Sequence, residues 1–193
     1  MRISGLGTGI SASAFIEHGL STTVLELDPA VLEAAKTYFG FKPTEPKKVY
    51  TSDARSWIAS QIHPDPFGPN AGKPKTPSET FDIVVHDVFS GGGVPAHLFS
   101  VGFWENLVKI MKPDGVVAVV RNSSLSPPSY LSDRARQNFA GKLLSDSGRA
   151  VVVTLQKVFP QCRAFHEFNV LLSDEKLKEE FMNWVRRPRL CRR

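Results

Sequence analysis

This sequence has few cysteines, and it lacks both long apolar runs and an apolar segment after Met1. Its 193 residues include two cysteines, Cys162 and Cys191, which form no metal-ligand spacing and are too few for a disulfide framework. No apolar run approaches the roughly 18 to 20 residues that a membrane span needs, and the residues after Met1 lack the apolar core of a signal peptide. We therefore expect a cytoplasmic protein with reduced thiols, no membrane segment and no metal site.

Acidic residues are absent from the last eight positions, and this absence sets the net charge. The chain has 24 Lys and Arg against 19 Asp and Glu, a net charge of +5. Five arginines lie within residues 186–193, so residues 1–185 hold nineteen basic and nineteen acidic side chains. Phosphate recognition needs cations clustered on a folded face. We therefore expect no nucleic-acid partner and interpret residues 186–193 as a basic C-terminal tail.

Short aliphatic runs alternate with longer amphipathic ones, which is typical of parallel strands joined by crossover helices. The pattern predicts strands at 3–6, 23–27, 48–51, 81–86, 116–120 and 168–172. It predicts helices at 11–18, 29–39, 54–60, 95–111 and 148–159, with a turn at 112–115. The fold class expected from this order is α/β, with a mostly parallel sheet flanked by helices.

Two segments interrupt the alternation. Residues 63–80 are rich in proline and glycine, and residues 121–137 are polar and broken by Pro127 and Pro128. Both are predicted to be loops or insertions. Since neither an internal repeat nor a second core is visible, we expect one α/β domain over residues 1–185.

A glycine-rich turn follows the first expected strand and leads into a helix. It reads Gly5-Leu6-Gly7-Thr8-Gly9, and glycines at such a turn let the backbone approach a ligand closely. The dinucleotide fingerprint requires a third glycine at position 10, which is Ile10 here. The spacing instead suits a single nucleoside without a pyrophosphate. The alternative is that a tight strand-to-helix turn selects glycines for steric reasons alone.

Carboxylates follow the next two strands at the same edge of the expected sheet. Glu26 lies about 20 residues beyond the first glycine, where a carboxylate can accept hydrogen bonds from a ribose diol. Asp28 is a weaker candidate, because it can cap the helix that begins at Pro29. Asp53 could accept from an adenine amino group with Ala54 against the base, or could cap the following helix. Together, three successive strand ends predict an adenosine site.

The fourth strand ends in an acidic residue, Asp87. A carboxylate there would face the reacting end of a ligand whose adenosine lies over the first strands, so Asp87 is the candidate general base or amine-binding group. The alternative is that it caps the glycine-rich turn after it. The histidines recur at no ligand spacing and are expected to pack or bond locally: His18, His63, His86, His97 and His166.

These motifs together resemble the class I S-adenosylmethionine-dependent methyltransferase fold, and within it the spermidine/spermine synthase-like branch. The matching stretches are residues 5–9, 24–29, 53–54, 81–95 and 112–115, with 158–163 later in the chain. The resemblance implies a Rossmann-like fold that binds S-adenosylmethionine or its decarboxylated form. The implied binding residues are Gly5, Gly7, Thr8, Gly9, Glu26, Asp28, Asp53 and Ala54, with Asp87 as the base in aminopropyl transfer to a small-molecule amine.

Three departures from that branch keep other readings open. Thr8 replaces the aspartate that holds the aminopropyl amine, Ser90 replaces a second aspartate, and the N-terminal hairpin has no counterpart before the first strand. The alternatives to an aminopropyltransferase are a methyltransferase with an unknown methyl acceptor and a non-catalytic member of the fold. The early start also fits a truncated or abbreviated member, and a homodimer is a further expectation.

Overall fold

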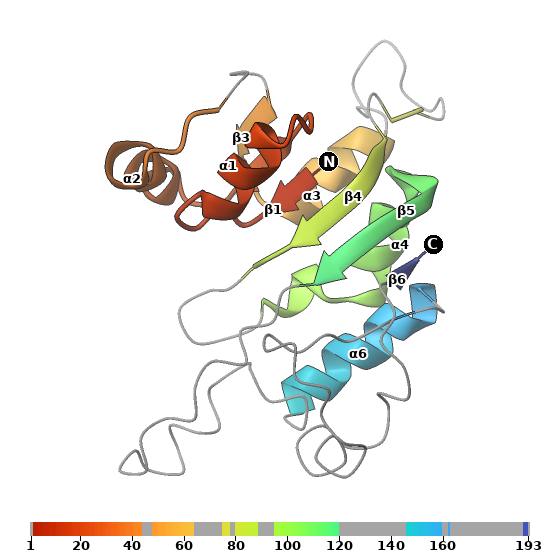
Figure 1. Ribbon diagram of the computed structural model, residues 1–193. Coiled ribbons are helices and arrows are strands. Elements are labelled where there is room, and N and C mark those ends of the chain that lie inside the picture. The colour runs from red at the N-terminus through yellow and green to blue at the C-terminus, as the bar shows by residue number, and fades with distance from the viewer. Residues whose placement is uncertain are drawn as a thin grey trace, which may run out of the picture.

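The computed structural model describes residues 2–43, 48–63, 75–77, 80–88, 95–119, 146–159, 162 and 191–192 (Figure 1). The predicted strand at 168–172 and the segment 121–137 lie outside these residues, as do Ser90 and most of 63–80.

A mostly parallel sheet forms the centre of the described structure, as the sequence predicted. Its strands are β1 (Arg2–Ser4), β2 (Thr23–Glu26), β3 (Val49–Thr51), β4 (Phe81–His86), β5 (Met111–Val119) and β6 (Cys191–Arg192). Their order is β3-β2-β1-β4-β5-β6, with the first five parallel and β6 antiparallel to β5. The crossover helices explain the parallel pairing, because a parallel neighbour requires a long return connection.

Helices cover both faces of this sheet. They are α1 (Ile10–Glu17), α2 (Pro29–Phe39), α3 (Ala54–Ile62), the 3₁₀ turn η2 (Ala96–Leu98), α4 (Val101–Lys109) and α6 (Asp146–Val158). Alternation along the strands divides the core in two. Val24 and Val85 pack with α1 and α2, whereas Leu25 and Val84 pack with α3, α4 and α6. The predicted α/β architecture is therefore confirmed (Figure 1).

The larger core contains a cluster of rings beneath β4. His86 is fully buried, and its ring centroid lies 4.9 Å from that of Phe99 and 5.0 Å from those of Phe103 and Trp104. The Trp104 indole donates to Thr154 Oγ1 at 3.3 Å, and Thr154 in turn donates to the Phe99 carbonyl at 2.6 Å. These contacts fix α4 and α6 against β4, the strand that precedes Asp87, and they confirm that His86 packs.

The helix predicted at 95–111 is wrong in its extent. The segment is divided into η2 and α4 at Ser100, whose Oγ accepts from the Phe103 amide at 3.2 Å. Serine binds a free first-turn amide in this way, so it starts a new helix rather than continuing the previous one.

The turn predicted at 112–115 is also corrected. Phe81 pairs with Met111 while Ile83 pairs with Val116, so four residues of β5 oppose one residue of β4. Residues 112–115 are thus a bulge within β5, and Lys112 Nζ lies 2.6 Å from Asp82 Oδ1 across it.

The C-terminal prediction needs two corrections. Cys191 and Arg192, expected in a basic tail, form β6 and pair with Val117 and Val116. Cys162 is disulfide-bonded, whereas the sequence suggested reduced thiols. No helix among the described residues is long and apolar enough to span a bilayer. Nor do these residues contain a group of three or more His, Cys, Asp or Glu that could hold a metal ion.

Candidate functional site

The strand order creates a candidate ligand site between β1 and β4. From β1 the sheet continues to β2 and β3 on one side, and from β4 it continues to β5 and β6 on the other. Ligands of open α/β sheets bind at such a switch point, outside the carboxyl ends of the strands. The glycine turn and Asp87 follow the two strands that meet there.

The three glycines of the turn differ in how much space a side chain would have. All adopt positive φ angles, 85° at Gly5, 55° at Gly7 and 80° at Gly9. A Cβ at Gly5 would lie 1.7 Å from the Asp87 carbonyl oxygen, and one at Gly9 would lie 2.9 Å from Phe41 Cβ. A Cβ at Gly7 would meet nothing within 4 Å. The steric alternative therefore accounts for Gly5 and Gly9, whereas Gly7 borders open space.

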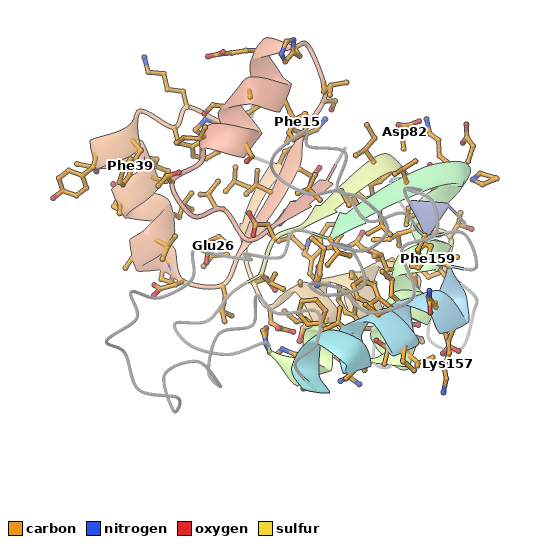
Figure 2. The ribbon with its side chains drawn as sticks, turned by 60° about the horizontal axis from the view of Figure 1, so that its bottom comes forward. Phe15, Glu26, Phe39, Asp82, Lys157 and Phe159 are labelled. Carbon is orange, nitrogen blue, oxygen red and sulfur yellow. The ribbon has the colours of Figure 1, made fainter. Side chains whose placement is uncertain are left out.

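Glu26 ties the end of β2 to the glycine turn. Its Oε2 accepts from the Leu6 amide at 2.8 Å, and its Oε1 accepts from the Asp28 amide at 3.0 Å. The residue is only 9% exposed and lies next to the start of α2 (Figure 2). Each carboxylate oxygen can accept more than one hydrogen bond, so the ribose role predicted for Glu26 is compatible with this geometry.

Asp28 is engaged in the capping role that the sequence offered as its alternative. Its Oδ1 accepts from the Ala30 amide at 2.8 Å, and Pro29 occupies the first position of α2. This contact explains Asp28 without a ligand, and its binding role stays a prediction.

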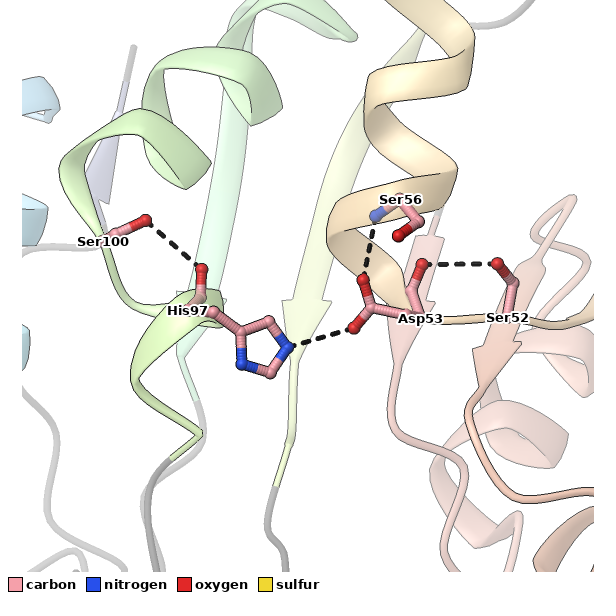
Figure 3. Close-up of polar contacts among 5 residues, drawn as sticks. All are labelled: Ser52, Asp53, Ser56, His97 and Ser100. Carbon is pink, nitrogen blue, oxygen red and sulfur yellow. Dashed lines mark hydrogen bonds and ion pairs between the residues drawn. The ribbon is translucent and has the colours of Figure 1, made fainter.

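Asp53 combines a cap with a contact that links two distant segments. Its Oδ1 accepts from the Ser56 amide at 2.9 Å at the start of α3, and its Oδ2 lies 3.1 Å from His97 Nε2 (Figure 3). Partial burial raises the pKa of the Asp53 carboxyl, but the hydrogen bonds from Ser56 and His97 outweigh it, and the net pKa lies below its ordinary value. Asp53 is therefore ionised at neutral pH, and both of its oxygens have hydrogen-bond partners at the sheet edge.

Ala54, predicted to lie against the base, is the first residue of α3. It is 6% exposed and packs in the core with Ile58, and its binding role stays a prediction. The buried residues of α3 are Ala54 and Ile58, which are four positions apart and therefore share one face of the helix.

The sequence interpretation missed three residues at this edge. His97 was expected to bond locally, yet it contacts a carboxylate 44 residues away. Ile10 and Leu27 are 67% and 68% exposed, and they directly follow Gly9 and Glu26. Their signal in the sequence was a large apolar residue directly after the glycine turn or after a strand-end carboxylate, which exposes apolar surface beside the candidate site.

Asp87 directly follows the carboxyl end of β4, and its backbone carbonyl oxygen lies against Gly5 of the glycine turn. Its side chain is exposed, and the neighbouring protein atoms still raise its pKa through desolvation. A carboxyl whose pKa is raised takes up a proton more readily than an ordinary aspartate. Its role as a base stays a prediction.

Comparison with known proteins identifies the fold. No protein-family model matches the chain. The chain is 32% identical over 165 residues to the N-terminal histidine N-methyltransferase of Emericella nidulans, a match that covers 86% of this chain and 24% of that protein. It is 26% identical over 171 residues to the polyamine aminopropyltransferase of Vibrio vulnificus, covering 86% and 53%.

Among solved structures, human methyltransferase-like protein 13 in complex with SAH superposes with a TM-score of 0.56 at 21% identity, covering 93% of this chain and 78% of that one. The chain has the class I methyltransferase fold. Gly7, Glu26 and Asp87 all follow or end strands at the carboxyl edge of this methyltransferase fold, next to the β1–β4 switch point. The chain spans between about a quarter and about half the length of the two curated relatives.

Two carboxyls of this methyltransferase fold should respond to pH in opposite directions. At neutral pH we expect Asp87→Asn to stabilise the protein, because desolvation raises the pKa of Asp87 and thus disfavours its charged form in the folded state. Below the unfolded pKa of Asp87 the carboxyl is neutral in both states, and no charge is desolvated by folding. As pH rises through the folded pKa, the carboxylate forms in the folded state as well, and the stability of the folded protein is lowered. The gain from Asp87→Asn should therefore vanish at about pH 3 in urea unfolding.

Asp82→Asn is the matched control for this pH series. The hydrogen bond from Lys112 lowers the pKa of Asp82, so its contribution is present at neutral pH and is lost as pH falls through the folded pKa. The control should show no stabilisation at neutral pH. Equal effects of the two substitutions on the free energy of unfolding at both pH values would contradict the opposite pKa shifts of Asp87 and Asp82.

Proposed function

We propose that the chain is an S-adenosylmethionine-dependent methyltransferase domain acting on a nitrogen acceptor. The observation that carries this choice is the 32% identity over 86% of the chain to a histidine N-methyltransferase. Its match to an aminopropyltransferase covers the same share of the chain at a lower 26% identity.

The described residues support a nucleoside site at the β1–β4 edge. Gly7 borders open space large enough to admit a ligand atom near the backbone. We propose that Glu26, held by the Leu6 and Asp28 amides, accepts from the ribose hydroxyls with its remaining lone pairs. Asp53 accepts from the adenine amino group. The exposed side chains of Ile10 and Leu27 supply apolar surface beside the base.

Thr8 favours the intact cosubstrate over the decarboxylated one. The residue is exposed in the glycine turn and carries no charge, so no carboxylate at this position holds an aminopropyl ammonium. A hydrogen bond to a charged group contributes about 1.5 to 3 kcal/mol. Intact S-adenosylmethionine carries a carboxylate beside its ammonium, and an aspartate at this position would repel that carboxylate, so the uncharged Thr8 favours the intact form relative to an aspartate.

When bound, S-adenosylmethionine supplies a methyl group activated on a sulfonium. The chain contributes binding and orientation through Gly7, Glu26 and Asp53. Asp87, whose pKa is raised by desolvation, is placed to accept a proton from the acceptor nitrogen. A cytoplasmic location stays a prediction.

Aminopropyl transfer is the second candidate, because an aminopropyltransferase is among the relatives and the resemblance to that branch would make Asp87, directly after β4, the base. Calorimetric titration separates the candidates. Tighter binding of intact S-adenosylmethionine than of its decarboxylated form is expected. The reverse preference would favour aminopropyl transfer, and binding of neither would leave a non-catalytic member of the fold.

A further inference from the structure

His97 reaches the candidate site from a different part of the chain than the residues predicted to form it. It belongs to η2, which follows the carboxyl end of β4, whereas Asp53 lies between β3 and α3. The two side chains meet at 3.1 Å between His97 Nε2 and Asp53 Oδ2 (Figure 3). The contact therefore joins the half of the edge that carries Asp87 to the half proposed to hold the adenine.

The backbone of His97 is fixed by its neighbours. Leu98 and Phe99 are 6% and 7% exposed and pack in the larger core. Ser100 Oγ donates to the His97 carbonyl at 3.2 Å and accepts from the Phe103 amide at the start of α4. The imidazole is thus presented by a segment anchored on both the core and α4, as a positioning group requires.

The chemistry of the pair defines the direction of the hydrogen bond. An ionised carboxylate only accepts, so His97 Nε2 carries the proton and donates to Asp53. Asp53 Oδ1 is already bound to the Ser56 amide. The Ser56 amide restrains one oxygen, and the His97 contact at the other oxygen further restricts rotation of the carboxylate about its Cβ–Cγ bond. Each oxygen keeps a lone pair for a further donor.

Stability alone does not account for this contact. The side chains of His97 and Asp53 are 49% and 28% exposed, and pairs that are open to solvent contribute little to folding. Solvent exposure therefore limits what this pair adds to folding, whereas its geometry restricts the orientation of an acceptor at the candidate ligand edge.

We propose that His97 is a positioning residue for nucleobase selection. It holds the Asp53 carboxylate in the plane in which a free lone pair accepts from the 6-amino group of adenine. The same orientation disfavours a 6-oxo purine, whose oxygen would face an acceptor. This inference rests on the proposed nucleoside function of the site and adds to it the source of preference for adenine.

The test compares S-adenosylhomocysteine with S-inosylhomocysteine, which differ at the 6-position of the base. Both are titrated by calorimetry into the full chain and into His97→Ala, His97→Leu and His97→Gln. Removal of the donor should reduce the adenine preference about fivefold or more, which is the effect of one hydrogen bond. His97→Gln should restore most of it, because its amide nitrogen can donate to Asp53. His97→Leu keeps bulk at the position if the alanine variant does not fold.

The matched control is His63→Ala, which removes an exposed histidine from the other end of α3 and should leave the ratio unchanged. An unchanged ratio in His97→Ala and His97→Leu would overturn the inference, as would a glutamine variant that behaves like leucine. Equal binding of the two ligands by the unsubstituted chain would also overturn it. Failure of the unsubstituted chain to bind either ligand would instead overturn the proposed function.

Discussion

Replacement of Gly5 by alanine is expected to lower the free energy of unfolding by about 3 to 5 kcal/mol, a large fraction of the stability of an ordinary domain. The added Cβ would lie 1.7 Å from the Asp87 carbonyl oxygen, and the φ of 85° already disfavours any side chain. The colliding atom belongs to the backbone at the end of β4, which pairs directly with β1. Relief would therefore require the two central strands to separate. Urea denaturation followed by circular dichroism measures the loss.

Gly7→Ala is the matched control in the same turn. Its φ is 55°, but a Cβ there would meet nothing within 4 Å. Only the backbone strain of about 1 to 2 kcal/mol should remain, while binding of S-adenosylhomocysteine weakens because the methyl group occupies ligand space. A loss at Gly5 no larger than the loss at Gly7 would contradict the close approach of β1 and β4.

Glu26→Gln is expected to reduce the affinity for S-adenosylhomocysteine about 100-fold, the equivalent of two weakened hydrogen bonds to the ribose. The same change should cost about 1 to 3 kcal/mol of stability. The amide oxygen of glutamine can serve the Leu6 or the Asp28 amide, but its NH₂ group faces the other as a second donor. Calorimetry and urea denaturation of one preparation measure both effects.

Glu33→Gln provides the control for the loss of one negative charge. Glu33 lies in α2, its side chain is 71% exposed, and it pairs with Lys36 at 3.5 Å. It should leave nucleoside affinity and stability nearly unchanged. If Glu26→Gln lowers stability but leaves affinity intact, Glu26 serves only to hold the glycine turn, and the ribose is bound elsewhere. The hydrogen bond from the Leu6 amide to Glu26 is the reason to expect a loss of stability as well as of affinity.

Much of the fold could be predicted from local patterns. The run from Phe81 to His86 was recognisable as a buried strand, because apolar residues dominate it before the chain becomes acidic. The start of α2 was predictable from Asp28 and Pro29, since a cap acts on amides two residues away. These features depend on neighbours in sequence, and all of them agree with the structure.

The errors concern features that compete with a local pattern. The stretch at 95–111 has helical periodicity throughout, but the Ser100 cap and the burial of Phe99 divide it into two elements. The turn-forming residues 112–115 were predicted to interrupt the chain, yet pairing of Met111 and Val116 with β4 keeps them inside β5 as a bulge. Cys191 was part of a charged segment, and only its pairing with Val117 makes it a strand residue.

The sequence by itself determined the alternation of strands and helices, the capped start of α2 and the set of polar residues at the strand ends. Periodicity and short-range hydrogen bonds establish these features, and both are encoded in adjacent residues. Only the tertiary structure decided that Gly5 must lack a side chain because of Asp87, that Glu26 accepts from the Leu6 amide, and that His97 contacts Asp53. Each of these contacts joins residues from different strand ends, and their distances depend on the order and register of the whole sheet.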